Sequence, residues 1–315
     1  MPYPALQSAA LVALLASLLV AAPSQAAESC PAPAQRPTAE QIAEGMKNAK
    51  DRGALWTITK DGKTSYLYGT IHIGRMEWMF PGPKVTAALM NTGALALEVD
   101  VTAPDTPQQR MAAAPPVTLT DADRSRLAKI AEGECVPPGA LDALHPVMQT
   151  IALAGLIGRR DGLHIQYGQE PSLTSLAKFM DRPVLSLETM ALQMDVIIPD
   201  DPATARLAFE EALKDLEDPD ARSKTRLLAD AWERGDLEAI DTIEEVCQCQ
   251  PTPLQREGFL ALNDGRNPGL ARRIAEEHAK GVPVLAAVGI LHMTGDKAVP
   301  KLLAEMGFEV TRVAY

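Results

Sequence analysis

Two short strings in the sequence place a histidine three residues after a glycine: Gly69-Thr70-Ile71-His72 and Gly289-Ile290-Leu291-His292. Each follows an apolar run that is typical of a buried strand. In α/β proteins the ends of such strands meet at one rim of the sheet, where ligands usually bind. Glycine lets the backbone turn sharply or approach another group closely at that point. The repeated pattern predicts that His72 and His292 converge on one site.

Two glutamates and an Arg-Asn pair are candidate partners for these histidines. Glu98 lies in Leu95-Ala96-Leu97-Glu98-Val99, and a carboxylate in a buried strand must be paired or bound to a metal. The alternative is an edge strand with Glu98 in water. Glu188 ends another predicted strand, where it either acts chemically or is a capping or salt-bridging carboxylate before the next helix. Arg266 either clamps a carboxylate or, with Asn267, bonds only its own loop.

Two imidazoles and one carboxylate form a set that accepts borderline divalent ions such as Mn, Co or Zn. We therefore expect His72, Glu98 and His292 to be the metal ligands, and Glu98, Glu188, Arg266 and Asn267 to be the catalytic groups. Such an ion polarises a carbonyl and makes water acidic near pH ~7, and a nearby carboxylate can serve as general base. The sequence contains no His-Glu-x-x-His, Gly-x-Ser-x-Gly or Walker A motif.

The composition is that of a folded, acidic protein. Hydrophobic residues make up 46% and charged residues 23% of the chain, and the net charge is −11. An acidic surface disfavours nucleic acids and anionic membranes as partners. The same surface is compatible with the capture of metal cations or basic peptides. The sequence does not indicate the oligomeric state.

The N-terminal residues predict export from the cytoplasm. The apolar run 9–22 is shorter than the ~20 residues of a membrane span, and small residues follow it. We expect residues 1–26 to be a signal peptide that is cleaved after Ala26, which makes the mature protein periplasmic or secreted and leaves it without an integral membrane span. An uncleaved anchor is the alternative, because residues 1–7 contain no Lys or Arg. Residues 27–52 are expected to form a mobile arm and a short helix.

Export places the cysteines in an oxidising compartment. The sequence contains Cys30, Cys135, Cys247 and Cys249. We expect one cysteine of the Cys247-Gln248-Cys249 string to pair with Cys135 or Cys30, because disulfide geometry requires a particular Cα separation. The sequence does not choose among the possible pairings.

The order of predicted elements indicates an α/β fold. A hairpin is expected around Asp61-Gly62. Both ends of the chain read strand, Gly-x-x-His, helix, strand, and residues 119–265 are mostly helical. This order predicts a mixed central β-sheet built from the N- and C-terminal halves, with a helical insertion in the middle, in a single domain at 53–315. The remaining histidines are expected to be structural or, for His278, solvated.

With these motifs in place, the chain resembles the TraB/GumN family, which is related to the Tiki metalloproteases. The resemblance covers about residues 53 to 315. It rests on these strings: Leu55-Trp56, Leu67-Tyr68-Gly69-Thr70-Ile71-His72, Ala96-Leu97-Glu98, Leu187-Glu188-Thr189 with Gln193, Arg266-Asn267, and Val288-Gly289-Ile290-Leu291-His292 with Gly295.

The resemblance implies a mixed α/β core and a metal-dependent active site formed by the paired motifs and acidic residues. Peptidase activity is established for some relatives. Two positions depart from the family pattern. Glu170 stands where relatives often carry Asp, and Asp264-Gly265 stands where a charged pair often precedes the Arg-Asn string. We expect neither departure to touch the histidines. The leading hypothesis is a metal-dependent hydrolase, most simply a peptidase with a peptide or protein substrate; the alternative is a non-catalytic haem or peptide binder that uses the same cleft.

Overall fold

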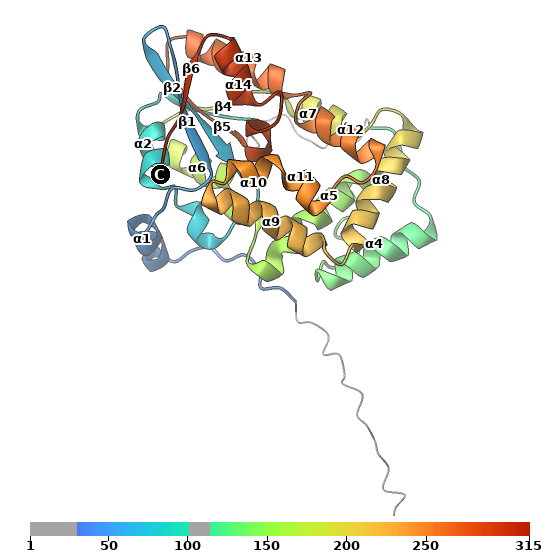
Figure 1. Ribbon diagram of the computed structural model, residues 1–315. Helices are drawn as coiled ribbons and strands as arrows, with labels where there is room; N and C mark the ends of the chain where they lie inside the picture. Colours follow the sequence, from blue (N-terminus) through green and yellow to red (C-terminus); the bar gives the residue numbers. More distant parts are fainter. Residues whose placement is uncertain (1–29, 101–113) are drawn as a thin grey trace, which may run out of the picture. The chain divides into compact units, whose positions relative to one another are not determined.

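The computed structural model describes residues 30–100 and 114–315, and its core is a six-stranded sheet (Figure 1). The predicted signal peptide lies outside the described residues. The strand order is β4-β3-β5-β2-β1-β6. The strands are β1 Ala54–Lys60, β2 Lys63–Thr70, β3 Ala94–Leu97, β4 Val184–Ser186, β5 Val284–Gly289 and β6 Glu309–Arg312.

Helices account for most of the remaining described chain. Their bounds are α1 Ala39–Lys47, α2 Pro83–Met90, α4 Asp121–Gly133, α5 Pro146–Ile157, α6 Gln169–Phe179, α7 Met190–Ile197, α8 Pro202–Glu217, α9 Ala221–Arg234, α10 Leu237–Asp241, α11 Ile243–Cys247, α12 Pro253–Leu262, α13 Asn267–Ala279 and α14 Val299–Glu305. The predicted α/β class and the helical middle are therefore confirmed. No helix in the two described stretches is long and apolar enough to cross a membrane.

The β1–β2 hairpin turns at Asp61 and Gly62, whose φ angles are 52° and 73°. Positive φ at both central residues is the geometry that Asp-Gly favours between antiparallel strands. β1 pairs β2 from Ala54 opposite Gly69 to Lys60 opposite Lys63. The hairpin thereby leads the second strand directly into the first Gly-x-x-His motif.

The other pairings set the positions of the motifs. β2 pairs β5 in parallel with Thr70 opposite Gly289, and β5 pairs β3 in parallel with Ala287 opposite Leu97. β3 in turn pairs β4 in parallel, with Leu97 opposite Ser186. The four strands β2, β3, β4 and β5 therefore end at the same edge of the sheet. Since ligands bind at the carboxyl ends of parallel strands, this edge is the natural place for a site.

β5 lies at the centre of this arrangement. Residues 284–288 are all buried, so both faces of the strand are covered. Helices α2 and α13 both contact β5, α6 contacts β3 and β4, and α14 contacts β6. The largest apolar cluster surrounds these strands and includes Leu95, Ala286 and Ile274.

The helical middle has a second apolar cluster of its own. It is formed by α4, α5 and α8 with residues near them, and its most buried side chains are Leu153, Phe209 and Leu213. In Figure 1 these three helices lie to one side of the sheet. A cavity of about 950 Å³ opens here beside Leu127 and Val136. None of the predicted site residues lines this cavity, so α4, α5 and α8 contribute packing and a separate hollow, whereas β4 of the same insertion contributes to the rim of the sheet.

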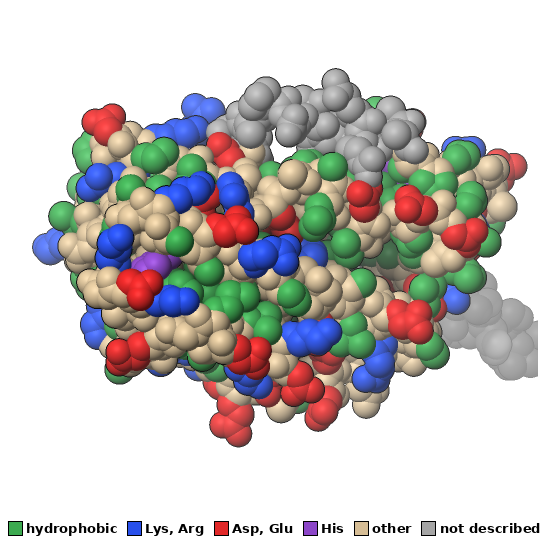
Figure 2. Space-filling view, turned by 90° about the horizontal axis from the view of Figure 1, so that it is seen from above, with side chains coloured by type: hydrophobic (Ala, Val, Ile, Leu, Met, Phe, Trp, Pro, Cys, Tyr) green, Lys and Arg blue, Asp and Glu red, His purple; other side chains and the backbone are tan. Residues whose placement is uncertain are grey.

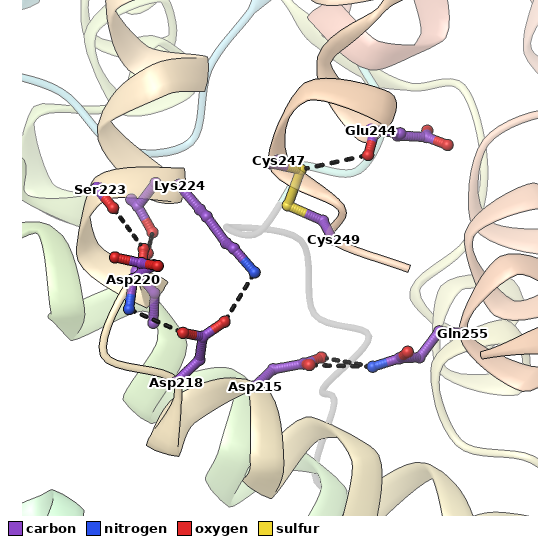
Figure 3. The surroundings of a disulfide bond; sticks show 11 residues. Asp215, Asp218, Asp220, Ser223, Lys224, Glu244, Cys247, Cys249 and Gln255 are labelled. Carbon is purple, nitrogen blue, oxygen red and sulfur yellow. Dashed lines mark hydrogen bonds and ion pairs between the residues drawn. A yellow bond between two sulfur atoms is a disulfide. The ribbon is translucent and has the colours of Figure 1, made fainter. Parts of the chain in front are cut away.

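The cysteine expectation is wrong for the Cys247-Gln248-Cys249 string. Cys247 and Cys249 bond each other across a Cα separation of 5.1 Å (Figure 3). The close pairing is reached because Gln248 ends α11 in a left-handed conformation, with φ 50° and ψ 41°. This backbone turn folds Cys249 back toward the last residue of the helix. The described residues contain no free cysteine.

The surface carries charges of both signs. Acidic and basic side chains are interspersed over the face shown in Figure 2, rather than gathered by sign. The acidic excess of the chain is therefore spread on this face, which presents no basic tract for a phosphate backbone.

Trp232 in α9 connects the helical middle to the first motif. Its indole N–H donates to the Gly69 carbonyl at 2.9 Å, and its own carbonyl accepts from the Gly53 N–H at 3.0 Å. The side chain is fully buried and packs against Trp78, with ring centroids 5.0 Å apart. α9 thus supports the residue from which the chain turns toward His72.

We predict that Trp232→Phe lowers the free energy of unfolding by about 1–3 kcal/mol, because it removes a buried donor from the Gly69 carbonyl. Urea unfolding measures this loss. Trp56→Phe makes the same change of ring size at a buried position of β1 and serves as the control. A Trp232→Phe protein no less stable than the control would show that this bond does not support the motif.

Candidate functional site

The predicted site residues converge at one edge of the sheet. His72 follows β2 by two residues, Glu98 follows β3 directly, and Glu188 follows β4 by two. His292 lies in the 3₁₀ turn Ile290–Met293 immediately after β5. Arg266 precedes the first residue of α13. Parallel pairing, rather than proximity in sequence, brings these groups together.

Gly289 lies at the meeting point of the two motifs. A Cβ atom built on this glycine would be 3.2 Å from Glu98 Oε1, 3.6 Å from His292 Cδ2 and 3.8 Å from His72 Nε2. A side chain at position 289 would therefore press against the carboxylate and face both rings. Glycine leaves this space open, which explains its place in the second motif.

Glu98 is buried, and its two oxygens are bonded. Its side chain is 11% exposed, and Oε1 accepts the Gly289 N–H at 2.7 Å. Oε2 accepts Arg266 Nη2 at 2.5 Å and Gln193 Nε2 at 3.3 Å. β3 is an internal strand of the sheet, so the alternative of an edge strand with Glu98 in water is wrong.

The Arg266 guanidinium joins both glutamates. Nη2 contacts Glu98 and Glu188, and Nε donates to Glu188 Oε2 at 3.2 Å. The Arg266 and Glu188 side chains are 6% and 7% exposed. Gln193 bonds both carboxylates as well, at 2.8 Å to Glu188 Oε1. Arg266 is therefore a carboxylate clamp, and Glu188 belongs to the same buried ion cluster.

His292 is buried and held in one tautomer. Its Nδ1 lies 2.5 Å from Asn267 Oδ1, and the Asn267 amide is oriented because its Nδ2 donates to the Lys297 carbonyl at 2.9 Å. Nδ1 must therefore carry the proton, which leaves a lone pair on Nε2. Arg266 Nη1 faces that lone pair at 3.4 Å. Asn267 thus orients the second histidine.

Burial decides the protonation of His292. It lowers the pKa of His292 to about 4, although the neighbouring Glu98 carboxylate opposes this change. The imidazole is therefore neutral at physiological pH, which suits a proton acceptor or a metal ligand.

For Glu98, burial alone would raise the pKa, but the two imidazoles, the Arg266 guanidinium and the Gly289 N–H outweigh burial and lower the pKa to about 2. Glu98 is therefore ionised throughout the physiological range.

His72 has a different setting. Its side chain is 70% exposed, and its Nδ1 lies 3.0 Å from Glu170 Oε1. The Glu170 carboxylate raises the pKa of His72 above its ordinary value, although water around the exposed ring screens the attraction. The expectation that Glu170 does not touch a histidine is wrong, because the turn before α6 returns to the end of β2.

Glu170 was not predicted as a site residue, although it had been noted as replacing an Asp of the family. Gln193 was noted as part of the family pattern but was given no role.

His278 was expected to be solvated, but it is 4% exposed and its Nδ1 lies 2.9 Å from Ser65 Oγ. The helix bearing His278 packs on the sheet, and the ring is turned inward.

The chemistry of the donor set suits a divalent ion. Imidazole nitrogen and carboxylate oxygen are accepted by Mn, Co and Zn, and His72 Nε2, the His292 ring and Glu98 Oε1 lie around Gly289. His292 Nε2 and Glu98 Oε1 are 3.9 Å apart, somewhat more than the roughly 3.0–3.4 Å between two ligands of one such ion. Over residues 30–100 and 114–315, no group of three or more His, Cys, Asp or Glu is arranged to hold a metal ion. A metal would require Arg266 Nη1 to move away from His292.

Comparison with known proteins identifies the family. The TraB/PrgY/gumN family model matches residues 54–312, and the chain belongs to this family. The protein YbaP of Shigella flexneri, described as uncharacterized, is 29% identical over 146 residues, which are 45% of this chain and 54% of YbaP. The match thus spans about half the length of that curated relative. No solved structure matches the chain.

We predict that Arg266→Leu lowers the free energy of unfolding by about 3–5 kcal/mol, because it leaves two buried carboxylates without their cation. Arg126→Leu is the matched control, since Arg126 pairs with Glu210 and Glu217 while 30% exposed. Its loss should be about 1 kcal/mol or less. Equal losses for the two variants in urea unfolding would contradict the account of the buried cluster.

The lowered pKa of His292 predicts that acid destabilises the fold. Unfolding returns the ring to an ordinary pKa of 6.5, so the unfolded state binds a proton that the folded state excludes until about pH 4. The free energy of unfolding should therefore fall between pH 6.5 and 4, with a contribution from this ring on the order of 3 kcal/mol.

Urea unfolding of the protein and of His292→Gln across this range isolates the effect of the ring, since all other groups are shared. The free energy of unfolding of His292→Gln should fall less steeply with decreasing pH than that of the unaltered protein. Identical slopes against pH would mean that His292 does not resist protonation in the folded protein.

Proposed function

We propose that this member of the TraB/PrgY/gumN family is a metal-dependent hydrolase, acting on peptide bonds outside the cytoplasm. The observation that carries the proposal is the gathering of His72 Nε2, the edge of the His292 ring and Glu98 Oε1 around Gly289, with His292 Nε2 3.9 Å from Glu98 Oε1. Glu98, His292 and Arg266 are buried beside this point, while the His72 side chain is 70% exposed. A substrate could therefore reach these groups from the His72 side.

The chain's own residues supply most of the chemistry. Neutral His292 presents the lone pair of its Nε2, because Asn267 holds the proton on Nδ1. The Arg266 guanidinium offers N–H donors beside the same atom and can stabilise a developing oxyanion. His72, whose Nδ1 is paired with Glu170, presents its Nε2 beside Gly289. Glu98 and Glu188 keep Arg266 in place.

In this proposal His72, Glu98 and His292 hold a divalent ion, Mn, Co or Zn. Lewis-acid polarisation of the scissile carbonyl, and water made acidic near pH ~7, are the chemistry that such an ion supplies. The imidazole lone pairs favour this binding, and Arg266 must turn from His292 for it to occur. Location outside the cytoplasm rests on the signal-like residues 1–26 and on the disulfide between Cys247 and Cys249.

We predict that the purified mature protein retains divalent metal and that His72→Ala and His292→Ala each reduce its content at least tenfold. Metal analysis by mass spectrometry measures this. A peptide library incubated with the metal-restored protein then tests for cleavage, which both variants should lose. His145→Ala is the control, because His145 caps α5 away from the rim and should change neither result.

Unchanged metal content in a protein that carries both substitutions would reject metal binding by the histidines. The second candidate from the sequence, a haem or peptide binder without turnover, has a distinct outcome. A Soret band that appears on haem addition and is lost in His72→Ala, with no peptide cleaved, would replace the hydrolase proposal with a binding function.

A further inference from the structure

We infer that Glu170 is the positioning residue for His72, holding the ring so that its Nε2 faces Gly289 and Glu98. Glu170 Oε1 lies 3.0 Å from His72 Nδ1 and accepts the Thr70 hydroxyl at 2.5 Å. One carboxylate oxygen thus binds two groups that flank the end of β2. This role rests on the proposed function, in which His72 Nε2 is the atom that acts.

Backbone contacts place Glu170 beside His72. The Gln169 N–H donates to the Ile71 carbonyl at 3.0 Å. Gly74 and His164 exchange two backbone hydrogen bonds, at 2.9 and 2.8 Å. These backbone bonds hold the segments 71–74 and 164–170 against each other and keep the Glu170 backbone next to the end of β2.

Gly168 allows this close approach. A Cβ atom on Gly168 would lie 2.5 Å from the His72 carbonyl oxygen, closer than side chains tolerate. The turn before α6 consequently lies against the backbone of the histidine itself. Glu170 is the second residue of α6, where the positive end of the helix favours a carboxylate.

Packing cannot orient His72 as it orients His292. The His292 side chain is 5% exposed and bonded to an amide, whereas His72 is 70% exposed. A ring in water rotates and exchanges tautomers unless a polar partner fixes it. In the neutral ring Nδ1 donates to Glu170 and the lone pair is left on Nε2, which lies 3.8 Å from the Cβ position of Gly289.

A carboxylate behind a histidine strengthens the histidine as a ligand, and loss of such a partner typically costs about 10–100-fold in metal affinity. Glu170 occupies this position behind His72.

The test uses the mature full chain with Glu170→Ala, Glu170→Gln and Glu170→Asp. Glu233→Gln is the matched control, because Glu233 is also partly buried and accepts Arg75 and Trp78 without touching His72. The first measurement is the ¹⁵N spectrum of His72 in metal-free protein, above the pKa of the ring. We expect Nδ1–H in the unaltered protein and in Glu233→Gln, and mainly Nε2–H in Glu170→Ala.

The second measurement is Mn²⁺ affinity by calorimetry. Glu170→Ala should weaken binding about 10–100-fold, Glu170→Gln should weaken it less because an amide oxygen can still accept Nδ1–H, and Glu170→Asp should restore part of the loss. If the unaltered protein binds no Mn²⁺, the proposed metal-dependent function is rejected. The His72 tautomer measured by NMR would then still test whether Glu170 positions the ring. An unchanged His72 tautomer in folded Glu170→Ala would overturn the positioning role.

Discussion

The arrangement of this edge of the sheet depends on one buried cation between two carboxylates. Arg266 bonds Glu98 at the end of β3 and Glu188 beyond β4, and all three side chains are about a tenth exposed or less. Buried charges are tolerated only when they are paired and hydrogen-bonded. Because Glu98 also accepts the Gly289 N–H, the cluster connects the start of α13 to the ends of β3, β4 and β5. These bonds hold the three strand ends in place relative to one another.

The two Gly-x-x-His motifs are alike in sequence but not in environment. His292 is enclosed, neutral and held by an amide, whereas His72 is open to water and held by a carboxylate. Both rings nevertheless lie beside the same glycine. A repeated sequence motif has therefore produced one buried, neutral imidazole inside the fold and one solvent-exposed imidazole at the edge of the sheet.

Much of this arrangement was predictable from the sequence. The apolar runs before each motif predicted buried strands of a mixed sheet, and the Asp61-Gly62 turn predicted the hairpin. The convergence of His72, Glu98 and His292 follows once those strands pair side by side. The partners of these residues were harder to foresee, because Glu170 and Gln193 come from helices whose docking depends on long-range packing. The left-handed Gln248 likewise carries no composition signal, so the Cys247–Cys249 disulfide was missed.

Family membership supplies the fold and the motif pattern, and the chemistry must come from the site itself. The most direct measurement is anomalous diffraction from crystals soaked in Mn²⁺. The account predicts one strong peak beside Gly289, within bonding distance of His72 Nε2, His292 Nε2 and Glu98, with Arg266 turned away from His292. Arg266 still bridging Glu98 and His292, with no peak at this edge of the sheet, would contradict it.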